Sequence, residues 1–410
     1  MPIRFPIAKV NHYLFQKQHL TAETRSKSIP SLTRDVGPIG AARPTVPYIS
    51  LWARMKDFRR EDLDDALYEE RSLLRVPCMR GQLYLVPTED YPAYYQVTKP
   101  FFQRGLEDLG HFFSRAGEEC EINYDLCDET LIQRVLEVVS SQGPHTIAEL
   151  TELLPILGTR VYHDPEYPDL GYSKLGTQLI PAMCAQGILV RTKPRGGWRS
   201  QVYMYEALSS WVPELDMEAF SAQEALQHVV GVYVKAFGPV TVGDISLWLG
   251  GYARRQVMAA LMDVGDALTR VQIANSPGVY FVYKEAVEAL RSHTFEEHSV
   301  ALLPPHDMYP MAYSDTSRFL SRRHRDHVFD RVGEPLGTVW LDGYIVGIWN
   351  SQPRDEHILV RLFEPLPPNV VALVGEETRR LSRFLDYASF DVEMEGSDEQ
   401  RLPEMEKALA

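Results

Sequence analysis

The sequence has few cysteines and no long apolar run, and these two absences exclude several classes of protein. The four cysteines, Cys78, Cys120, Cys127 and Cys184, match neither a zinc-site spacing nor a redox motif. We interpret them as reduced thiols of a cytosolic protein. No apolar run reaches the roughly 18 residues that indicate a membrane span. Residues 1–15 contain no uninterrupted apolar signal segment, so we expect a cytoplasmic protein.

Net positive charge is also lacking. The chain has 42 Lys and Arg residues against 56 Asp and Glu residues, a formal charge of −14. This balance argues against a protein that coats nucleic acid indiscriminately, but it is compatible with a groove that has a local positive field. Part of the acidic excess lies in residues 391–410, which we expect to form a disordered or frayed acidic tail.

Metal and cofactor motifs are the third absence. The sequence contains no metal-ligand spacing and no Gly-rich phosphate loop of the nucleotide-binding kinds. It therefore implies no metal and no cofactor. The length of 410 residues predicts roughly two to four domains, each large enough to bury a core.

What the sequence does contain is a compact pattern at residues 128–206. Its first segment has apolar residues at helical spacing. Thr146 caps a short second helix, and a third helix fits residues 173–186. Two β-patterned runs around Gly196-Gly197 then predict a hairpin. Three helices followed by a hairpin is the order of a winged helix, whose third helix enters the major groove of DNA.

The third helix and the hairpin of this pattern are basic. Residues 173–205 contain five Lys or Arg residues and no acidic residue. Because Lys and Arg displace the counterions condensed on phosphates, a basic strip on an acidic protein favours contact with nucleic acid. The alternative interpretation is a solvated surface hairpin. The candidate DNA-binding residues in this strip are Lys174, Arg191, Lys193, Arg195 and Arg199.

A second copy of the pattern spans residues 222–290. Segments 143–150 and 238–245 share Gly, Pro, Thr, a β-branched residue and an acidic residue at equivalent positions. A preceding helix, a following helix and a hairpin complete the repeat. Arg254 and Arg255 fall at the start of the third helix, where base-reading side chains usually lie. The alternative is a degenerate copy that is kept for packing.

The regions on either side of these two copies predict the remaining domains. Residues 1–95 contain helical segments and a hairpin that turns near Arg80-Gly81, which predicts a further winged helix. Residues 96–127 have apolar residues at helical spacing and predict connecting helices. Residues 299–390 contain strand-patterned runs and a final helix, which predict a small antiparallel β unit with a closing helix. The fold class is therefore α+β.

A basic run lies between the predicted strands of that last unit. It is either a phosphate contact or a solvated surface. Its candidate DNA-binding residues are Arg322, Arg323 and Arg325.

Five segments in a fixed order carry a resemblance to a known family. They are P-Y-I-S-L-W-A-R at 47–54, M-R-G-Q-L-Y-L-V at 79–86, G-P-V-T-V-G-D-I-S-L-W-L-G at 238–250, L-L-P-P-H-D-M-Y-P-M-A-Y at 302–313 and V-W-L-D-G-Y-I-V-G-I-W at 339–349. Together they resemble the AlkZ-like family of winged-helix, crosslink-repair DNA glycosylases. The resemblance covers about residues 8–385 and implies three tandem winged helices and a β-barrel-like unit, in a C-shape that receives duplex DNA.

The resemblance also implies an activity, that of a monofunctional glycosylase which removes N-alkylated purines, including interstrand crosslinks, from duplex DNA. Alkylation at N7 makes the purine cationic and therefore a good leaving group. Catalysis then needs chiefly a positioned water and stabilisation of an oxocarbenium-like transition state. A crosslinked base cannot flip fully out of the helix, so an open cleft suits it better than a closed pocket. We expect a monomer that associates with the nucleoid.

One motif of the family is missing. The family places Gln-x-Gln or Gln-x-Asp just before P-Y-x-x-L-W, and the polar ends of this motif hold the attacking water. The matching positions here are Gly40-Ala41-Ala42, which have no side chain able to orient a water. Between Gln18 and Gln82 the chain contains no glutamine, so no shift of the alignment restores the motif.

The catalytic residues therefore stay unassigned, and a few polar side chains remain as candidates. Asp35 either helps to hold the water or is a surface turn residue. Thr45 either helps to hold the water or is a turn or helix-cap residue. His306-Asp307 forms either a base with its hydrogen-bond partner or a structural pair at a strand end. Arg80 matches the family and either contacts phosphate or pairs with a buried acid.

Three functions are compatible with these observations. The first is a glycosylase-like repair protein for alkylated or crosslinked DNA. The second is a catalytically disarmed binder of lesions or a regulator, which the Gly40-Ala41-Ala42 departure favours. The third is a protein–protein adaptor, which the acidic net charge favours, and a steep fall of DNA affinity with salt would argue against it.

Overall fold

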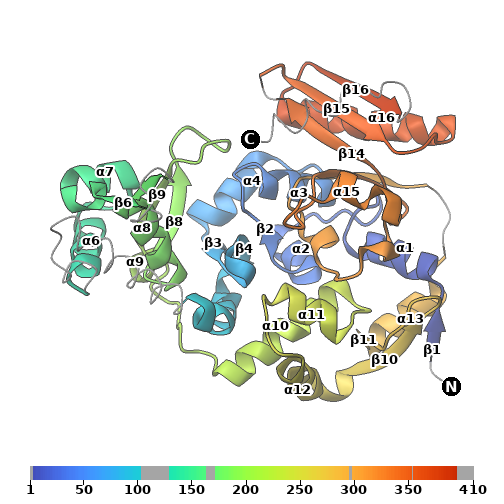
Figure 1. Cartoon of the computed structure of the whole chain (residues 1–410), viewed down its shortest axis with the longest axis horizontal. Coiled ribbons are helices and arrows are strands. Elements are labelled where there is room, and N and C mark those ends of the chain that lie inside the picture. Colours follow the sequence, from blue (N-terminus) through green and yellow to red (C-terminus); the bar gives the residue numbers. More distant parts are fainter. Residues whose placement is uncertain (1–2, 103–128, 163–170, 295–297, 353, 395–410) are drawn as a thin grey trace.

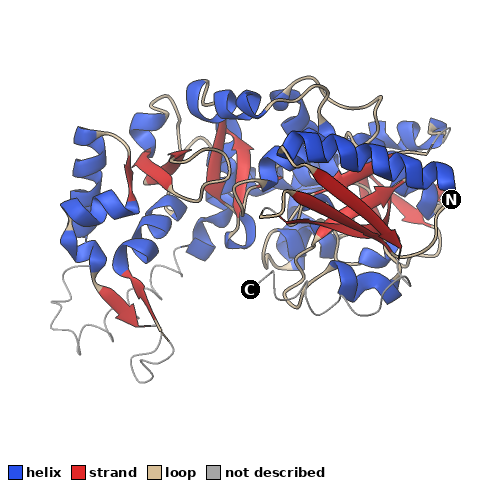
Figure 2. Cartoon of the chain, turned by 90° about the horizontal axis from the view of Figure 1, so that it is seen from above, coloured by secondary structure: helices blue, strands red, loops and turns tan. Residues whose placement is uncertain are grey.

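The structure, a computed structural model, describes residues 3–102, 129–162, 171–294, 298–352 and 354–394. It has mixed α+β architecture with several small sheets (Figures 1 and 2). Within these described ranges, no helix is long and apolar enough to cross a membrane. The predicted connecting helices of residues 96–127 lie mostly outside the described residues, as do Cys120 and Cys127. Cys78 and Cys184 are buried free thiols.

The N-terminal unit packs helices against a three-stranded sheet in the order β2-β4-β3. Ser28 caps α2 by accepting a hydrogen bond from the amide of Ser31, and Gly37 ends this helix. The predicted hairpin is confirmed, with Arg80 in a left-handed conformation (φ 59°) at its turn. The elements are α1 (Ile7–Lys17), α2 (Ile29–Val36), β2 (Ile39–Gly40), α3 (Val46–Arg54), α4 (Arg60–Asp64), β3 (Leu73–Pro77) and β4 (Leu83–Pro87).

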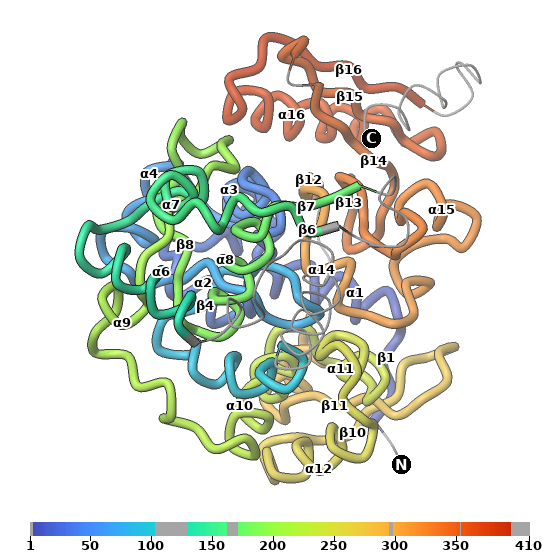
Figure 3. The backbone as a smooth tube through the Cα atoms, turned by 60° about the vertical axis from the view of Figure 1, so that its left-hand side comes forward, coloured from blue at the N-terminus to red at the C-terminus, as the bar shows by residue number. Residues whose placement is uncertain are grey.

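The second unit contains the helices and the hairpin that its sequence pattern predicts. Thr146 and Glu149 form the expected reciprocal capping box at the start of α7. Figure 3 shows hairpin β6–β7 projecting from the rest of the unit. The elements are α6 (Glu129–Gln142), β5 (His145–Thr146), α7 (Ile147–Leu153), β6 (Arg160–Tyr162), β7 (Tyr172–Lys174), α8 (Leu175–Ala185), β8 (Leu189–Pro194), β9 (Tyr203–Ala207) and α9 (Leu208–Trp211).

The third unit repeats the same order of elements. Thr241 and Asp244 form a capping box at α11, equivalent to the one at α7. Strand β1 pairs in parallel with β10, so the N-terminus of the chain extends the third unit's hairpin. The elements are β1 (Ile3–Phe5), α10 (Ala222–Phe237), α11 (Val242–Trp248), α12 (Arg254–Val264), β10 (Leu268–Ile273), β11 (Tyr280–Tyr283) and α13 (Lys284–Ser292).

The C-terminal unit is a five-stranded sheet with strands in sequence order, and α16 packs on it (Figure 2). Short helices lie in the long connection between its first two strands. The elements are β12 (Val300–Leu303), α14 (Met308–Met311), α15 (Arg325–Val328), β13 (Gly337–Leu341), β14 (Tyr344–Gln352), β15 (His357–Leu362), α16 (Pro368–Leu385) and β16 (Ser389–Met394).

Four details of the sequence prediction are wrong. The acidic tail does not begin at residue 391, because β16 (Ser389–Met394) is an ordered edge strand. This strand pairs in parallel with β15, so the sheet is not wholly antiparallel. The third helix of the second unit begins at Leu175, since residues 172–174 pair with β6 as a strand. The final helix begins earlier than Glu376, with a proline at its first turn.

Two separate cores hold the chain together. One core lies wholly within residues 131–207 and includes Val135, Leu150 and Ile180. The other joins residues from the N-terminal, third and C-terminal units and also includes Val190, Leu208 and Trp211 of the second unit. The second unit therefore has a core of its own and lies to one side of the molecule (Figure 1), but it is attached to the common apolar interior through these residues.

Candidate functional site

The site begins at the two positions that would carry the missing polar motif. Gly40 in β2 pairs with Tyr84 in β4, and the amide of Ala41 donates to the carbonyl of Leu83 (2.8 Å). The strand β2 ends at Gly40, and Ala42 lies in the bend that follows it. Gln82 directly precedes Leu83, the partner of Ala41, so its backbone lies next to this segment.

Gly40 is closely packed, whereas Ala42 is open to solvent. A Cβ on Gly40 would lie 2.7 Å from the carbonyl oxygen of His306, a distance that real Cβ atoms essentially never show. Ala42 is exposed. No side chain larger than glycine fits at Gly40 without movement of the backbone, so the residue is fixed by close packing of β2 against the segment that precedes α14.

A polar cluster of Gln82, His306 and Glu334 lies beside the segment that holds Gly40 and Ala41. Gln82 Nε2 donates to Glu334 Oε1 at 2.7 Å. His306 Nδ1 lies 3.0 Å from Glu334 Oε2 but is not aligned with it as a hydrogen bond. Glu334 retains 26% side-chain exposure. The three side chains come from segments far apart in the sequence, and the fold brings them together next to this segment.

Burial lowers the pKa of His306 below its usual value of 6.5, and nearby Arg43 acts in the same direction. Glu334 and Asp330 act in the opposite direction and do not overcome the burial. His306 is therefore neutral near pH 7. It has the left-handed φ of 59° on a non-glycine residue, a conformation that is often kept at functional sites.

Asp307, a candidate from the sequence, is fully occupied by structural contacts. Its carboxylate accepts two hydrogen bonds from Arg54 at 2.7 and 2.8 Å and one from Ser50 at 2.7 Å. It also accepts from the amide of Tyr309 at the start of α14. The side chains of Arg54 and Asp307 are 4% and 2% exposed. These four bonds leave no acceptor position for a water.

The other polar candidates face different partners. Asp35 is part-buried, and its carboxylate lies 3.2 Å from His19 Nε2 and 4.0 Å from Lys235 Nζ. Thr45 is the N-cap residue of α3, but its side chain makes no capping hydrogen bond. Neither residue is brought into the cluster of Gln82, His306 and Glu334.

Arg80 and Arg254 line one cavity of about 480 Å³. It lies between the turn after β3 and the segment that joins α11 to α12. Both arginines are exposed, no acidic residue lines the cavity, and neither guanidinium is ion-paired within the described part of the chain. Gly250 allows the close approach, because a Cβ there would lie 3.2 Å from the backbone nitrogen of Arg80. The arrangement is suited to an anion.

The basic residues of the second unit's hairpin are mostly engaged within the protein. Arg195 pairs with Glu149 at 2.5 Å. Arg199 donates to the carbonyl of Leu385 and stacks on Trp198 and Tyr387. The hairpin thus docks on the C-terminal unit. The remaining two residues of this hairpin contact aromatic rings, Lys193 on Tyr68 and Arg191 on Tyr205.

The remaining candidate cations are spread over three elements. Lys174, now at the N-cap of α8, and Arg255 in α12 are exposed. Arg323 forms an ion pair with Glu364, and Arg325 lies 3.4 Å from Asp326. Arg322 is exposed. The structure therefore brings Arg80 and Arg254 together but leaves the hairpin and the basic run at separate places.

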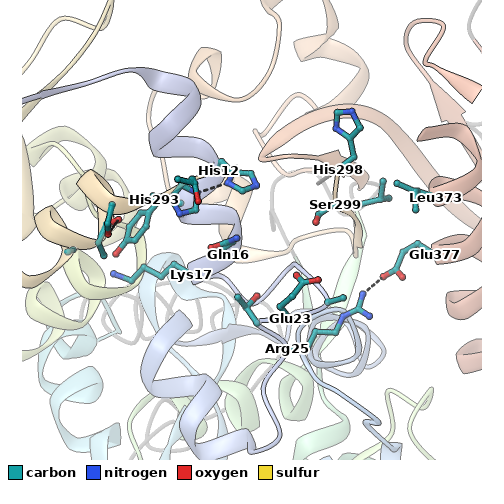
Figure 4. Close-up of a pocket in the computed structure, with 18 of the residues that line it drawn as sticks. His12, Gln16, Lys17, Glu23, Arg25, His293, His298, Ser299, Leu373 and Glu377 are labelled. Atoms are coloured by element: carbon teal, nitrogen blue, oxygen red, sulfur yellow. Dashed lines mark hydrogen bonds and ion pairs between the residues drawn. The ribbon is translucent and has the colours of Figure 1, made fainter. Parts of the chain in front are cut away.

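A larger cavity, of about 1090 Å³, lies elsewhere and shares none of these residues (Figure 4). Its lining mixes acidic and basic groups, including Arg25, whose guanidinium pairs with Glu377 at 2.8 Å. His12 Nδ1 and His293 Nε2 are 2.5 Å apart on its wall. Among the described residues, no group of three His, Cys, Asp or Glu side chains is placed to hold a metal ion.

Glu334 is the residue that sequence reasoning missed. It lies between the predicted strands and in none of the family-like segments. Gln82 stands in the family-like segment at 79–86 and marked the end of the glutamine-free window, but nothing in the linear sequence indicates that it lies beside residues 40–42. The pairing of β2 with β4 is the signal that brings these segments together.

A solved structure shares the fold of this protein over nearly the whole chain. The structure is similar to the DNA glycosylase AlkZ of Streptomyces sahachiroi, with a TM-score of 0.70 and 20% sequence identity, over 96% of this chain and 100% of that one. The sequence is 27% identical over 163 residues to an interstrand DNA cross-link repair glycosylase of the same organism, which is 39% of this chain and 43% of the relative. The model of the DNA glycosylase AlkZ-like family matches residues 34–384. The chain therefore belongs to the AlkZ-like DNA glycosylase family.

Proposed function

We propose that this protein is a DNA glycosylase that hydrolyses the N-glycosidic bond of N-alkylated purines in duplex DNA, including crosslinked purines. Its membership of the AlkZ-like family, with the match extending across residues 34–384, carries this proposal. The related protein from Streptomyces sahachiroi is described as an interstrand DNA cross-link repair glycosylase. The substrate class for this chain follows from that relationship.

We interpret the first three units as winged helices. In the second and third units, a capping box starts the middle helix, and a further helix and an antiparallel hairpin follow. The N-terminal unit ends in the hairpin β3–β4. With the C-terminal sheet, these units would form the C-shaped channel for duplex DNA that the family resemblance implies.

We assign the cavity between Arg80 and Arg254 to a phosphate of the bound duplex. Two guanidinium groups without an ion-pair partner among the described residues, and a lining free of acidic residues, are suited to phosphate recognition. Arg80 also precedes Gln82 by only two residues, so a phosphate held here places DNA beside the polar cluster. The hairpin residues Arg195 and Arg199 contribute less, because they have partners within the protein.

A second function, a DNA binder without hydrolytic activity, is favoured by one observation. The two positions at which the family holds its water are Gly40 and Ala42, and the packing at Gly40 excludes any side chain. Losing one such positioning group at an active site typically costs on the order of a hundredfold or more in rate. A protein that binds alkylated duplex and releases no base would have this second function.

Base release decides between the two functions. A duplex oligonucleotide with one N7-alkylguanine is incubated with the protein and with a heat-matched blank. Release well above the blank is the expected result. Absence of release, from a preparation that retains the same duplex at low salt, would establish the binder. A protein that neither releases base nor retains duplex would contradict both functions.

A further inference from the structure

The segment 40–42 has no polar side chain that can hold a water, but polar side chains from other segments lie close to it. Gly40 packs against the carbonyl of His306. The imidazole of His306 lies 3.0 Å from Glu334, and Gln82, next to the partner of Ala41, donates to Glu334. The polar atoms that the chain lacks at 40–42 are therefore present beside that segment, just before β4 and on the turn before β13.

We propose that Glu334 is the catalytic residue that holds and deprotonates the attacking water, with Gln82 and His306 as positioning residues. This inference rests on the proposed glycosylase function. It replaces the family's paired glutamines with a carboxylate that reaches the same place from the C-terminal unit. The Gly40-Ala41-Ala42 departure is then a relocation of the water-holding group and not its loss.

Glu334 is fixed by its backbone as well as by its side chain. Its amide donates to Asp330 Oδ1 at 2.8 Å, and its carbonyl accepts from the amide of Asp330 at 3.0 Å. A bridge between Phe329 and Pro335 closes the same turn. The turn faces the surface, because Val332 at its tip is 71% exposed. Rigid support beneath an accessible side chain is what a preorganised catalytic group needs.

The carboxylate has free capacity for a water. Oε1 accepts the single hydrogen bond from Gln82, and Oε2 lies near the neutral His306 without a hydrogen bond. Each carboxylate oxygen has two acceptor positions, so both oxygens keep at least one. Asp307 has none left, since Arg54, Ser50 and Tyr309 fill all four of its positions. Of these two acids, only Glu334 can accept a water.

The proposed step balances without a further reactant. The water oxygen bonds to C1′ as the C1′–N9 bond breaks, and the bonding electron pair passes into the cationic purine. The N7-alkylpurine leaves as a neutral base. A proton of the water moves to the Glu334 carboxylate and then to solvent, and an abasic sugar remains.

The test is single-turnover base release from the N7-alkylguanine duplex by Glu334→Gln and Glu334→Ala, with duplex affinity measured on the same preparations. We expect each substitution to lower the rate about 100-fold or more, with unchanged affinity. Gln82→Ala is expected to lower it less, about tenfold, because Gln82 only orients the acid. Formate is expected to restore part of the rate of Glu334→Ala and none of the rate of Gln82→Ala.

Asp342→Asn is the matched control, because Asp342 also pairs with a histidine, His298 at 2.7 Å, outside the cluster. Its rate should equal that of the unchanged protein. A Glu334→Gln rate within about threefold of the unchanged protein, or a parallel loss of rate and affinity, would overturn the assignment of Glu334. If the unchanged protein itself releases no base, the proposed function fails and this assignment fails with it.

Discussion

The guanidinium of Arg54 makes two hydrogen bonds to the carboxylate of Asp307, 253 positions further along the chain. The pair joins α3 to the start of α14, and both side chains are nearly inaccessible to solvent. It therefore fixes the segment that carries His306 against the strand that carries Gly40. The acid that stands in a family-like segment thus supports the site, and its neighbour in sequence, His306, enters it.

Removing the acid from this pair should strongly destabilise the protein. Asp307→Ala leaves the Arg54 cation buried without a partner, for which the typical cost is about 3–5 kcal/mol in the free energy of unfolding. Urea unfolding measures it. Asp326→Ala, which breaks an exposed contact with Arg325, should change stability by less than about 0.5 kcal/mol. Equal effects of the two substitutions would contradict the structural role of Asp307.

The phosphate assignment predicts a change in the salt dependence of DNA binding. Each neutralised phosphate contributes about 0.9 to the slope of log affinity against log salt, so losing the one phosphate held by both arginines in the double variant Arg80→Ala with Arg254→Ala should flatten the slope by about 0.9. Arg195→Ala with Arg199→Ala should flatten it less, because both side chains already have partners in the protein. Fluorescence anisotropy over a salt series gives the slopes. A larger effect from the hairpin pair would place the main contact on the hairpin.

Restoring the family's glutamines should succeed at one position and fail at the other. Ala42→Gln places the new side chain on an exposed surface and should leave the unfolding free energy nearly unchanged. Gly40→Gln forces a Cβ toward the carbonyl of His306 and should cost about 1–3 kcal/mol or more. Thermal unfolding of the two variants tests this difference. Equal stability would mean that β2 can move away from His306.

Acid should lower the free energy of unfolding through three histidines, of which His12 is buried and His293 and His306 are half-buried. Burial lowers the pKa of His12, His293 and His306 below 6.5 in the folded protein. Their contribution to the free energy of unfolding is complete above about pH 6.5. It falls as the pH drops below this value, because the unfolded chain then binds more protons than the folded protein. Each additional proton bound by the unfolded chain changes the free energy of unfolding by at most about 1.4 kcal/mol per pH unit, and by less where the imidazole is partly exposed.

Urea unfolding at pH 7 and pH 5 measures this loss. His306→Asn should reduce the difference between the two pH values, because it removes one of the three groups. A stability that rises toward pH 5 would contradict the lowered pKa values.

The local structure of this protein could be predicted from its sequence with few errors. Thr146 with Glu149 and Thr241 with Asp244 are capping boxes whose partners stand three residues apart, so the sequence displays both members. The hairpin turn at Arg80-Gly81 is local for the same reason. The errors occur where a distant strand intervenes: β6 pairs with residues 172–174, and β15 with β16.

The sequence by itself determined the family and the order of the units, because family-like segments, caps and turns depend on neighbouring residues. Only the tertiary structure decided which charged side chains are engaged within the protein and which can bind a ligand. Asp307 is occupied by Arg54, and Arg195 by Glu149, whereas Arg80 and Arg254 meet without an acid. Gln82, His306 and Glu334 become one cluster only through long-range packing. Whether a polar group can do chemistry depends on the partners that the fold brings to it, and the linear sequence does not contain those distances.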